Sequence, residues 1–179
     1  MTNKKYFIAI VLPEPFQNEI EEIKHWLYSE YGLKGALRSP AHITLHRPFE
    51  WKEEKENVLI EKLNAFNFDA QFKLDLKDFD FFEPRVVFVN VLQNQALTEL
   101  HSRLRSYAQK ELKLLNEIND LRGFHPHVTV AFRDLKKPLF FELQKQFRQK
   151  QFQASFNYTN FSLLKLNKSW EAIYDFGKS

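Results

Sequence analysis

The pattern of apolar and polar positions predicts one order of elements that is repeated once along the chain. The apolar run Tyr6 to Leu12 is typical of a strand, and apolar residues then recur at helical spacing until Gly32. Residues 41–46 alternate like a strand, a charged segment from Lys52 looks helical, and residues 71–82 alternate again. The first part of the chain therefore predicts strand, helix, strand, helix and one or two further strands.

The same order recurs from residue 84 onward. Its expected elements are a strand at 86–91, a helix around 97–107, a strand at 127–132, a helix around 139–147, and strands at 152–158, 161–166 and 170–176. Two copies are too few for a solenoid. We therefore expect a single bilobal domain over residues 1–179, with lobe-like halves at roughly 1–83 and 84–179 related by a pseudo-twofold axis.

A His-x-Thr sequence lies in the second strand of each copy. Strand alternation predicts one polar face carrying His42, Thr44 and His46, and a second carrying His127, Thr129, Ala131 and Arg133. The apolar faces opposite should pack on helices, which would leave both motifs at a cleft between lobes. A solvated strand face is an adequate explanation of one such motif, but matched positions in two copies favour a shared function.

These residue types suit in-line cleavage of a phosphodiester. The reaction needs a base on the attacking oxygen, an acid on the leaving oxygen, and donors for the non-bridging oxygens. Histidines with a pKa of about 6.5 can supply one neutral and one protonated imidazole near neutral pH. A threonine hydroxyl about 6.6 Å along the strand from each histidine can donate to the phosphoryl oxygens.

Composition removes several other classes of function. The chain has no cysteine and only 4 glycines, which excludes thiol chemistry and argues against Gly-rich phosphate loops and dinucleotide fingerprints. A net charge of +3 and a pI near 9.0 fit an anionic ligand and ordinary solubility equally. No segment approaches the roughly 20 apolar residues that span a bilayer, and no cleavage site follows the first apolar run. We expect a cytoplasmic protein that binds no membrane.

The motifs His42-Ile-Thr44-Leu45 and His127-Val-Thr129-Val130 resemble the paired motifs of the 2H phosphoesterase superfamily, in its 2'-5' RNA ligase or RNA 2',3'-cyclic phosphodiesterase branch. The opening residues 7–13 and the Pro40-x-His42 approach are also similar, and the duplicated order of elements covers nearly the whole chain. The first motif continues as His46-Arg47-Pro48-Phe49, where the family more usually has an Arg-Phe-Leu-Gly type of sequence. The resemblance therefore leaves open which residues near this motif contact the substrate.

The resemblance implies an α+β fold of two lobes, each an antiparallel sheet flanked by helices, with the motifs facing across a central cleft. It makes His42 the proton donor and His127 the proton acceptor in opening a 2',3'-cyclic phosphate to a 2'-phosphomonoester, and it leaves a reversible 2'-5' ligation open. Thr44 and Thr129 would bind the phosphate. The resemblance implies no metal and no cofactor, and we expect a monomer whose partner is RNA or a cyclic nucleotide, with no obligate protein partner.

Two further residues are weaker candidates. Arg133 could clamp a phosphate, although a surface arginine at a strand end is an equal explanation. Tyr174 could line the substrate groove and stack on a base, although core packing is the alternative.

Two other functions compete with the phosphodiesterase hypothesis. His42 with His46, and His125 with His127, have a spacing that metal hydrolases use. A non-catalytic module that only binds nucleotides or RNA would also keep such a groove.

Overall fold

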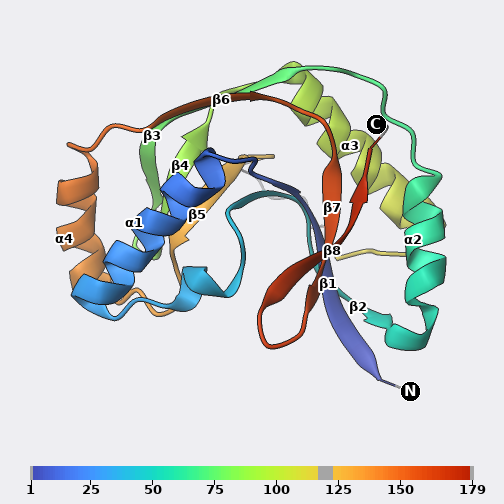
Figure 1. The fold of residues 1–179 in the computed structure, drawn as a ribbon, viewed down its shortest axis with the longest axis horizontal. Helices are drawn as coiled ribbons and strands as arrows, with labels where there is room; N and C mark the ends of the chain where they lie inside the picture. Colours follow the sequence, from blue (N-terminus) through green and yellow to red (C-terminus); the bar gives the residue numbers. More distant parts are fainter. Residues whose placement is uncertain (1, 117–122, 178–179) are drawn as a thin grey trace.

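The computed structural model describes residues 2–116 and 123–177 (Figure 1). Its elements, in chain order, are β1 (Asn3–Val11), α1 (Phe16–Tyr31), η1 (Gly35–Arg38), β2 (His42–Lys52), η2 (Glu53–Lys55), α2 (Glu56–Asn64), β3 (Lys73–Phe82), β4 (Val86–Val91), α3 (Gln95–Glu111), β5 (His127–Ala131), α4 (Lys137–Phe147), β6 (Gln153–Asn157), β7 (Phe161–Leu166) and β8 (Trp170–Phe176). Here η marks a short 3-10 helix. The helices and strands predicted from the sequence are all present in the predicted order.

The strands form two four-stranded antiparallel sheets. One has the order β2-β1-β7-β8 and the other the order β5-β4-β3-β6. The two sheets approach each other through β2 and β5, which are in contact. The predicted α+β fold with two antiparallel sheets flanked by helices is confirmed.

The division of the chain between the sheets differs from the predicted halves 1–83 and 84–179. β3 belongs to the first half of the sequence but pairs with β4 and β6, whereas β7 and β8 return to the sheet of β1 and β2. Each lobe therefore contains strands from both halves. The reason is that β1 has β7 as its second neighbour, so the end of the chain completes the sheet that its beginning started.

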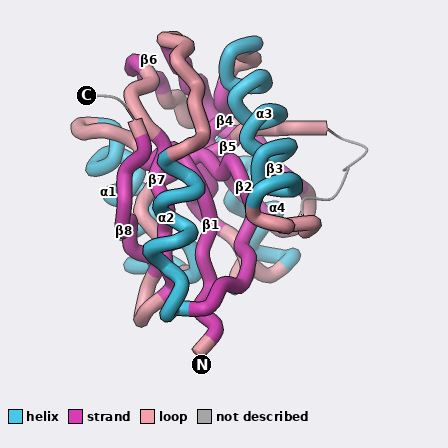
Figure 2. Tube along the Cα trace, turned by 90° about the vertical axis from the view of Figure 1, so that its right-hand side faces the viewer, coloured by secondary structure: helices cyan, strands magenta, loops and turns pink. Residues whose placement is uncertain are grey.

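Helices cover the outer face of each sheet. In Figures 1 and 2, α2 and α3 lie against the sheet of β1, and α1 and α4 lie beside the sheet of β4. α1 follows β1 in sequence, yet it contacts β5 of the other lobe. Gly32 caps the C-terminus of α1 and adopts the left-handed conformation (φ 71°) that glycine tolerates best. Asn94 caps the N-terminus of α3, because its side chain accepts a hydrogen bond from the Leu97 amide.

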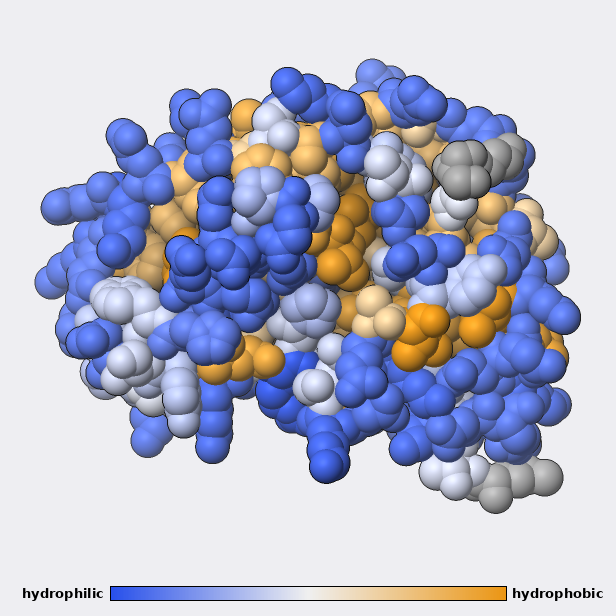
Figure 3. Space-filling view, viewed as in Figure 1, coloured by the Kyte–Doolittle hydropathy of each residue, from blue (hydrophilic) through white to orange (hydrophobic). Residues whose placement is uncertain are grey.

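A large core of aliphatic and aromatic side chains joins the two lobes. A smaller cluster of Phe7, Ala9 and Leu164 lies on the inner face of the first sheet, and Val11 and Trp170 pack against it. Hydrophilic residues cover most of the face seen in Figure 3, and hydrophobic residues show through near its middle. Within 2–116 and 123–177, no helix is long and apolar enough to cross a membrane.

Candidate active site

Both motif strands change register directly after the threonine. Ala9 pairs with Thr44, but its neighbour Ile8 pairs with His46, so Leu45 is an extra residue in β2. Opposed residues of an antiparallel pair point to the same side, and an extra residue reverses the alternation. His46 therefore turns into the core together with Ile8, where its buried ring packs edge-on against Phe49. The predicted shared face of His42, Thr44 and His46 is correct for the first two only.

The second motif strand has the same irregularity. Phe88 pairs with Thr129, whereas Val87 pairs with Ala131, so Val130 is the extra residue. Ala131 is buried in the core beside Val87, and the prediction that it shares the face of His127 and Thr129 is wrong. The two register changes follow the same motif position in both copies.

The four motif side chains line one cleft of about 260 Å³ between the sheets. Arg133, a candidate from the sequence, also lines it. The other lining residues come from both lobes and from the η1 region: Phe7, Gly35, Ala36, Arg38, Ser39, Pro48, Val86, Phe132 and Trp170. The structure therefore brings together His42, Thr44, His127, Thr129 and Arg133.

Both imidazoles are held in the same tautomer by the same kind of contact. Nδ1 of His42 lies 2.7 Å from the carbonyl oxygen of Pro40, and Nδ1 of His127 lies 2.7 Å from that of His125. A carbonyl oxygen can only accept, so each Nδ1 carries the hydrogen that it donates. Nε2 of each ring is left with its lone pair available to the cleft. These carbonyls two residues upstream were not identified from the sequence, although Pro40-x-His42 and His125-x-His127 share that spacing.

Burial lowers the pKa of both rings, which favours their neutral forms in the free protein. Burial is the largest effect on His42 and lowers its pKa to about 4. The hydrogen bond to the Pro40 carbonyl raises this pKa, and the nearby Lys24 and His127 lower it further. Burial also lowers the pKa of His127, again against a hydrogen bond from its own Nδ1 to a backbone carbonyl. The rings pack on aromatic neighbours, with Phe7 4.8 Å from His42 and Phe88 5.0 Å from His127 between ring centroids. An anion in the cleft would favour protonation of these imidazoles.

Two side chains of α1 hold the segment that leads into the first motif. Gln17 accepts a hydrogen bond from the Ala41 amide (2.7 Å) and donates to the Ala41 carbonyl (3.0 Å). Lys24 is buried, and its Nζ donates to the Ser39 carbonyl (2.9 Å) and lies 2.8 Å from a carboxylate oxygen of Glu21. The Pro40 carbonyl lies between these two anchored residues, so α1 indirectly positions the ring of His42.

The charged groups in the cleft wall favour an anion. Arg38 and Arg133 line it, and no carboxylate is among its described lining residues. Asp134 joins the two segments that carry these arginines, because its carboxylate accepts from the Gly35 amide at 3.0 Å and from the Lys34 amide at 2.8 Å. A side chain at Gly35 would come within 2.6 Å of the Phe132 carbonyl, so glycine allows this close approach. Arg38 was not identified from the sequence.

Tyr174 does not line the cleft. β8 has a register change at Ile173, because Leu164 pairs with Ala172 and Leu163 with Tyr174. This change turns Tyr174 to the helix-covered face, where its hydroxyl accepts a hydrogen bond from Asn64 Nδ2 (3.0 Å). The sequence-based placement of Tyr174 in the groove therefore does not match the structure.

Trp170 provides the aromatic wall from the same strand. Its ring lies edge-on to Phe7, with 4.7 Å between the ring centroids, and both line the cleft. Alternation alone does not separate Trp170 from Tyr174, because the two residues are four apart and a regular strand would place them on one face.

The histidine pairs that suggested a metal site are not arranged as one. His46 faces the core, and His125 packs edge-on against Phe82 and Phe88 outside the cleft wall. Among residues 2–116 and 123–177, no group of three or more His, Cys, Asp or Glu side chains is placed to hold a metal ion.

Known proteins resemble this chain in sequence and in fold. A protein of Geobacillus sp. (strain WCH70) that carries a phosphoesterase name is 27% identical over 176 residues, which cover 96% of this chain and 94% of that protein. The RNA 2',3'-cyclic phosphodiesterase of Archaeoglobus fulgidus is 26% identical over 152 residues, 83% of each chain. The crystal structure of E. coli LigT complexed with 3'-AMP has the same fold, with a TM-score of 0.64, 22% identity and 99% coverage of both chains.

The family model described as the 2'-5' RNA ligase superfamily matches residues 12–170. That match spans both motifs and most of the chain. The chain therefore belongs to the 2'-5' RNA ligase superfamily, the 2H phosphoesterases.

Proposed function

We propose that this protein hydrolyses 2',3'-cyclic phosphate ends of RNA or of nucleotides to 2'-phosphomonoesters, with His42 as proton donor and His127 as proton acceptor. The observation that carries the proposal is the pair of imidazoles in one cleft, each with Nδ1 bound to a backbone carbonyl and Nε2 left for the substrate. The name of the Archaeoglobus relative supports the same substrate class.

In the proposed reaction, Nε2 of His127 takes a proton from water as the water oxygen attacks phosphorus. The bond between phosphorus and O3' breaks as protonated His42 gives its Nε2 proton to O3'. The product is a 2'-phosphate with a free 3'-hydroxyl. A 5'-hydroxyl in place of water would give a 2'-5' linkage, which is the ligation that the superfamily name describes.

In this proposal, the ring of His42 becomes protonated when the substrate binds. In the free protein, burial favours neutral imidazoles, whereas the negative charge of a bound phosphodiester favours the imidazolium. Thr44 and Thr129 would donate to the non-bridging oxygens, and the guanidinium groups of Arg38 and Arg133 would balance their charge. This arrangement needs one base, one acid and fixed donors, all of which the side chains in the cleft can supply.

The decisive experiment is incubation with a 2',3'-cyclic nucleotide, with the product identified by phosphorus NMR. We expect the 2'-phosphate, and we expect His42→Ala and His127→Ala each to reduce turnover by roughly 10² or more. His25→Ala, which removes an exposed ring on α1, is the matched control.

Three results would reject parts of the proposal. A wild-type rate in either cleft variant would remove that histidine from the mechanism. A 3'-phosphate product would reject O3' as the leaving group. Binding without turnover would favour the second candidate, a module that only binds nucleotides or RNA.

A further inference from the structure

A second and larger pocket lies where the chain crosses between the two lobes. Its volume is about 800 Å³, within the usual range for small-molecule sites. Its walls are the connection from α2 to β3 (residues 65–72), the connection from β6 to β7 (158–160), and residues at the ends of α2, β7 and β8. It shares no lining residue with the catalytic cleft.

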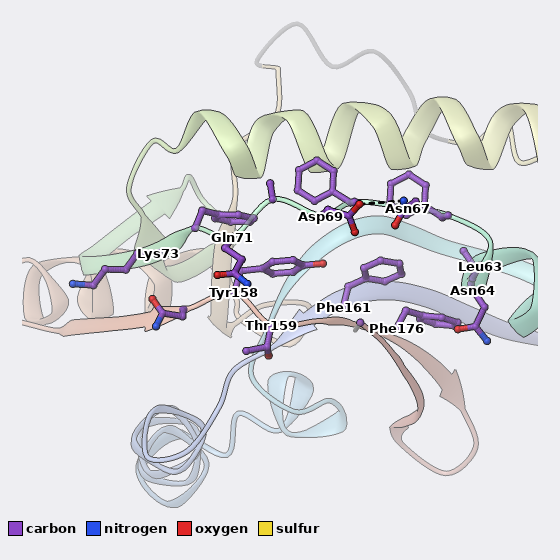
Figure 4. Close-up of a pocket in the computed structure, with 16 residues that line it drawn as sticks. Leu63, Asn64, Asn67, Asp69, Gln71, Lys73, Tyr158, Thr159, Phe161 and Phe176 are labelled. Carbon is purple, nitrogen blue, oxygen red and sulfur yellow. Dashed lines mark hydrogen bonds between the residues drawn. The ribbon is translucent and has the colours of Figure 1, made fainter. Parts of the chain in front are cut away.

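Aromatic rings form much of the pocket wall. Phe72 and Tyr158 stack almost parallel, with ring centroids 4.7 Å apart and planes at 13°, and Phe161 and Phe176 stack at 5.2 Å and 25°. Figure 4 shows the rings of Tyr158, Phe161 and Phe176 around the same space. Flat rings held in place by such pairs present rigid surfaces on which another flat ring can stack.

Amide side chains lie among these rings. Asn64, Asn67, Gln71 and Asn157 line the pocket. Asn67 donates to Asp69 at 3.2 Å, as the dashed line in Figure 4 marks. Within the described part of the chain, the Gln71 and Asn157 side chains make no hydrogen bond. Each amide can donate and accept, which suits a ring with both kinds of group on its edge.

Tyr158 points a polar group into this pocket. The residue is 9% exposed, and its hydroxyl has no hydrogen-bond partner among residues 2–116 and 123–177. Figure 4 shows the hydroxyl directed into the space toward Phe161. Burial raises the pKa of Tyr158 to about 12, so the group is a protonated donor near neutral pH. A protonated hydroxyl that faces the pocket can donate a hydrogen bond to a ligand bound there.

The charges around the pocket argue against an anion or a purely apolar ligand. Asp69 and Lys73 are its charged lining residues and carry opposite signs. The guanidinium of Arg103 is already engaged, because it donates to the Asn67 carbonyl at 2.9 Å and lies 5.2 Å over the Phe68 ring. These walls fit a ligand that is uncharged, flat and polar at its edge, and a nucleobase has these properties.

We propose that this pocket binds a nucleobase, either that of a free nucleoside or an unpaired base of an RNA. The pocket is separate from the cleft and does not depend on the proposed reaction. Binding is read without turnover, so the failure of either proposal is visible by itself.

The test is NMR of the full-length 15N-labelled chain titrated with adenosine and with uridine, which carry no phosphate. We expect the amide resonances of 64–73 and 157–161 to shift. Ala70→Trp places a large side chain in the pocket from an exposed connection and should abolish these shifts. Tyr158→Phe should weaken binding about 5-fold through loss of one hydrogen bond. Tyr28→Phe, at an exposed tyrosine on α1, is the matched control.

A second arm separates the two sources of the base. A short single-stranded oligoribonucleotide that binds at least about 10-fold more tightly than the nucleosides, and loses that advantage in Ala70→Trp, would identify RNA. Equal affinity would identify the free nucleoside. The proposal is overturned if no resonance of the pocket shifts at about 10 mM nucleoside, if only residues of the cleft respond, or if Ala70→Trp binds as the wild type does.

Discussion

Replacing His42 with glutamine should reduce the amount of unfolding free energy that the protein loses when the pH falls. Burial is the main cause that lowers the pKa of this ring from 6.5 to about 4. Between those pH values, the unfolded chain binds a proton at position 42 that the folded chain does not. The contribution of the neutral ring is therefore complete above about pH 6.5 and is lost as the pH falls toward 4.

The size of the effect follows from the same two values. At about 1.4 kcal/mol for each pH unit, the interval corresponds to about 3 kcal/mol of unfolding free energy. The pKa of His127 is lowered as well, so that ring adds acid sensitivity of the same sign, and the variant keeps it.

The assay is urea unfolding followed by tryptophan fluorescence at about pH 7.5 and about pH 4.5. We expect the acid-induced loss of stability in His42→Gln to be smaller than in the wild type by about 2 kcal/mol or more. His25→Gln, at an exposed position on α1, is the matched control. Equal losses in His42→Gln and the wild type would refute the reasoning, because they would mean that the ring of His42 is not buried as a neutral group.

Other predictions concern the groups around the two histidines. Gln17→Leu removes the hydrogen bonds that hold the residue before His42 and should cost about 2 to 4 kcal/mol in a urea titration; a loss below about 1 kcal/mol would contradict the anchoring role. Lys24→Met removes a cation that lowers the pKa of His42, so the pH profile of kcat/KM should move to higher pH, and an unmoved profile would count against this coupling. Thr129→Val should reduce kcat about 10-fold with little change in KM, whereas a change in KM alone would indicate ground-state binding. Turnover should survive treatment with a chelator, and loss of turnover would favour the alternative that the protein is a metal hydrolase.

The sequence was sufficient to predict the elements and the paired motifs because both depend on local patterns. Alternating or helical spacing identified each strand and helix, and the His-x-Thr repeat identified four of the cleft side chains. Predictions failed where a single extra residue changes which way a side chain points. Leu45, Val130 and Ile173 are such residues, and they explain the misplacement of His46, Ala131 and Tyr174.

Long-range pairing could not be predicted either. The neighbours of β1 include β7, from the opposite end of the chain, and no local pattern specifies that partner. The cleft residues that the sequence did not reveal, such as Arg38 and Trp170, depend on the same long-range arrangement.

The placement of β1 between β2 and β7 also affects how the protein is made. A ribosome releases β1 and β2 early, but the strand that flanks β1 on its other side emerges only near the end of synthesis. The wall that carries Phe7 and Trp170 cannot assemble before residue 170 has left the exit tunnel. A product truncated between residues 127 and 170 would thus contain both cleft histidines but would lack the complete wall of the cleft.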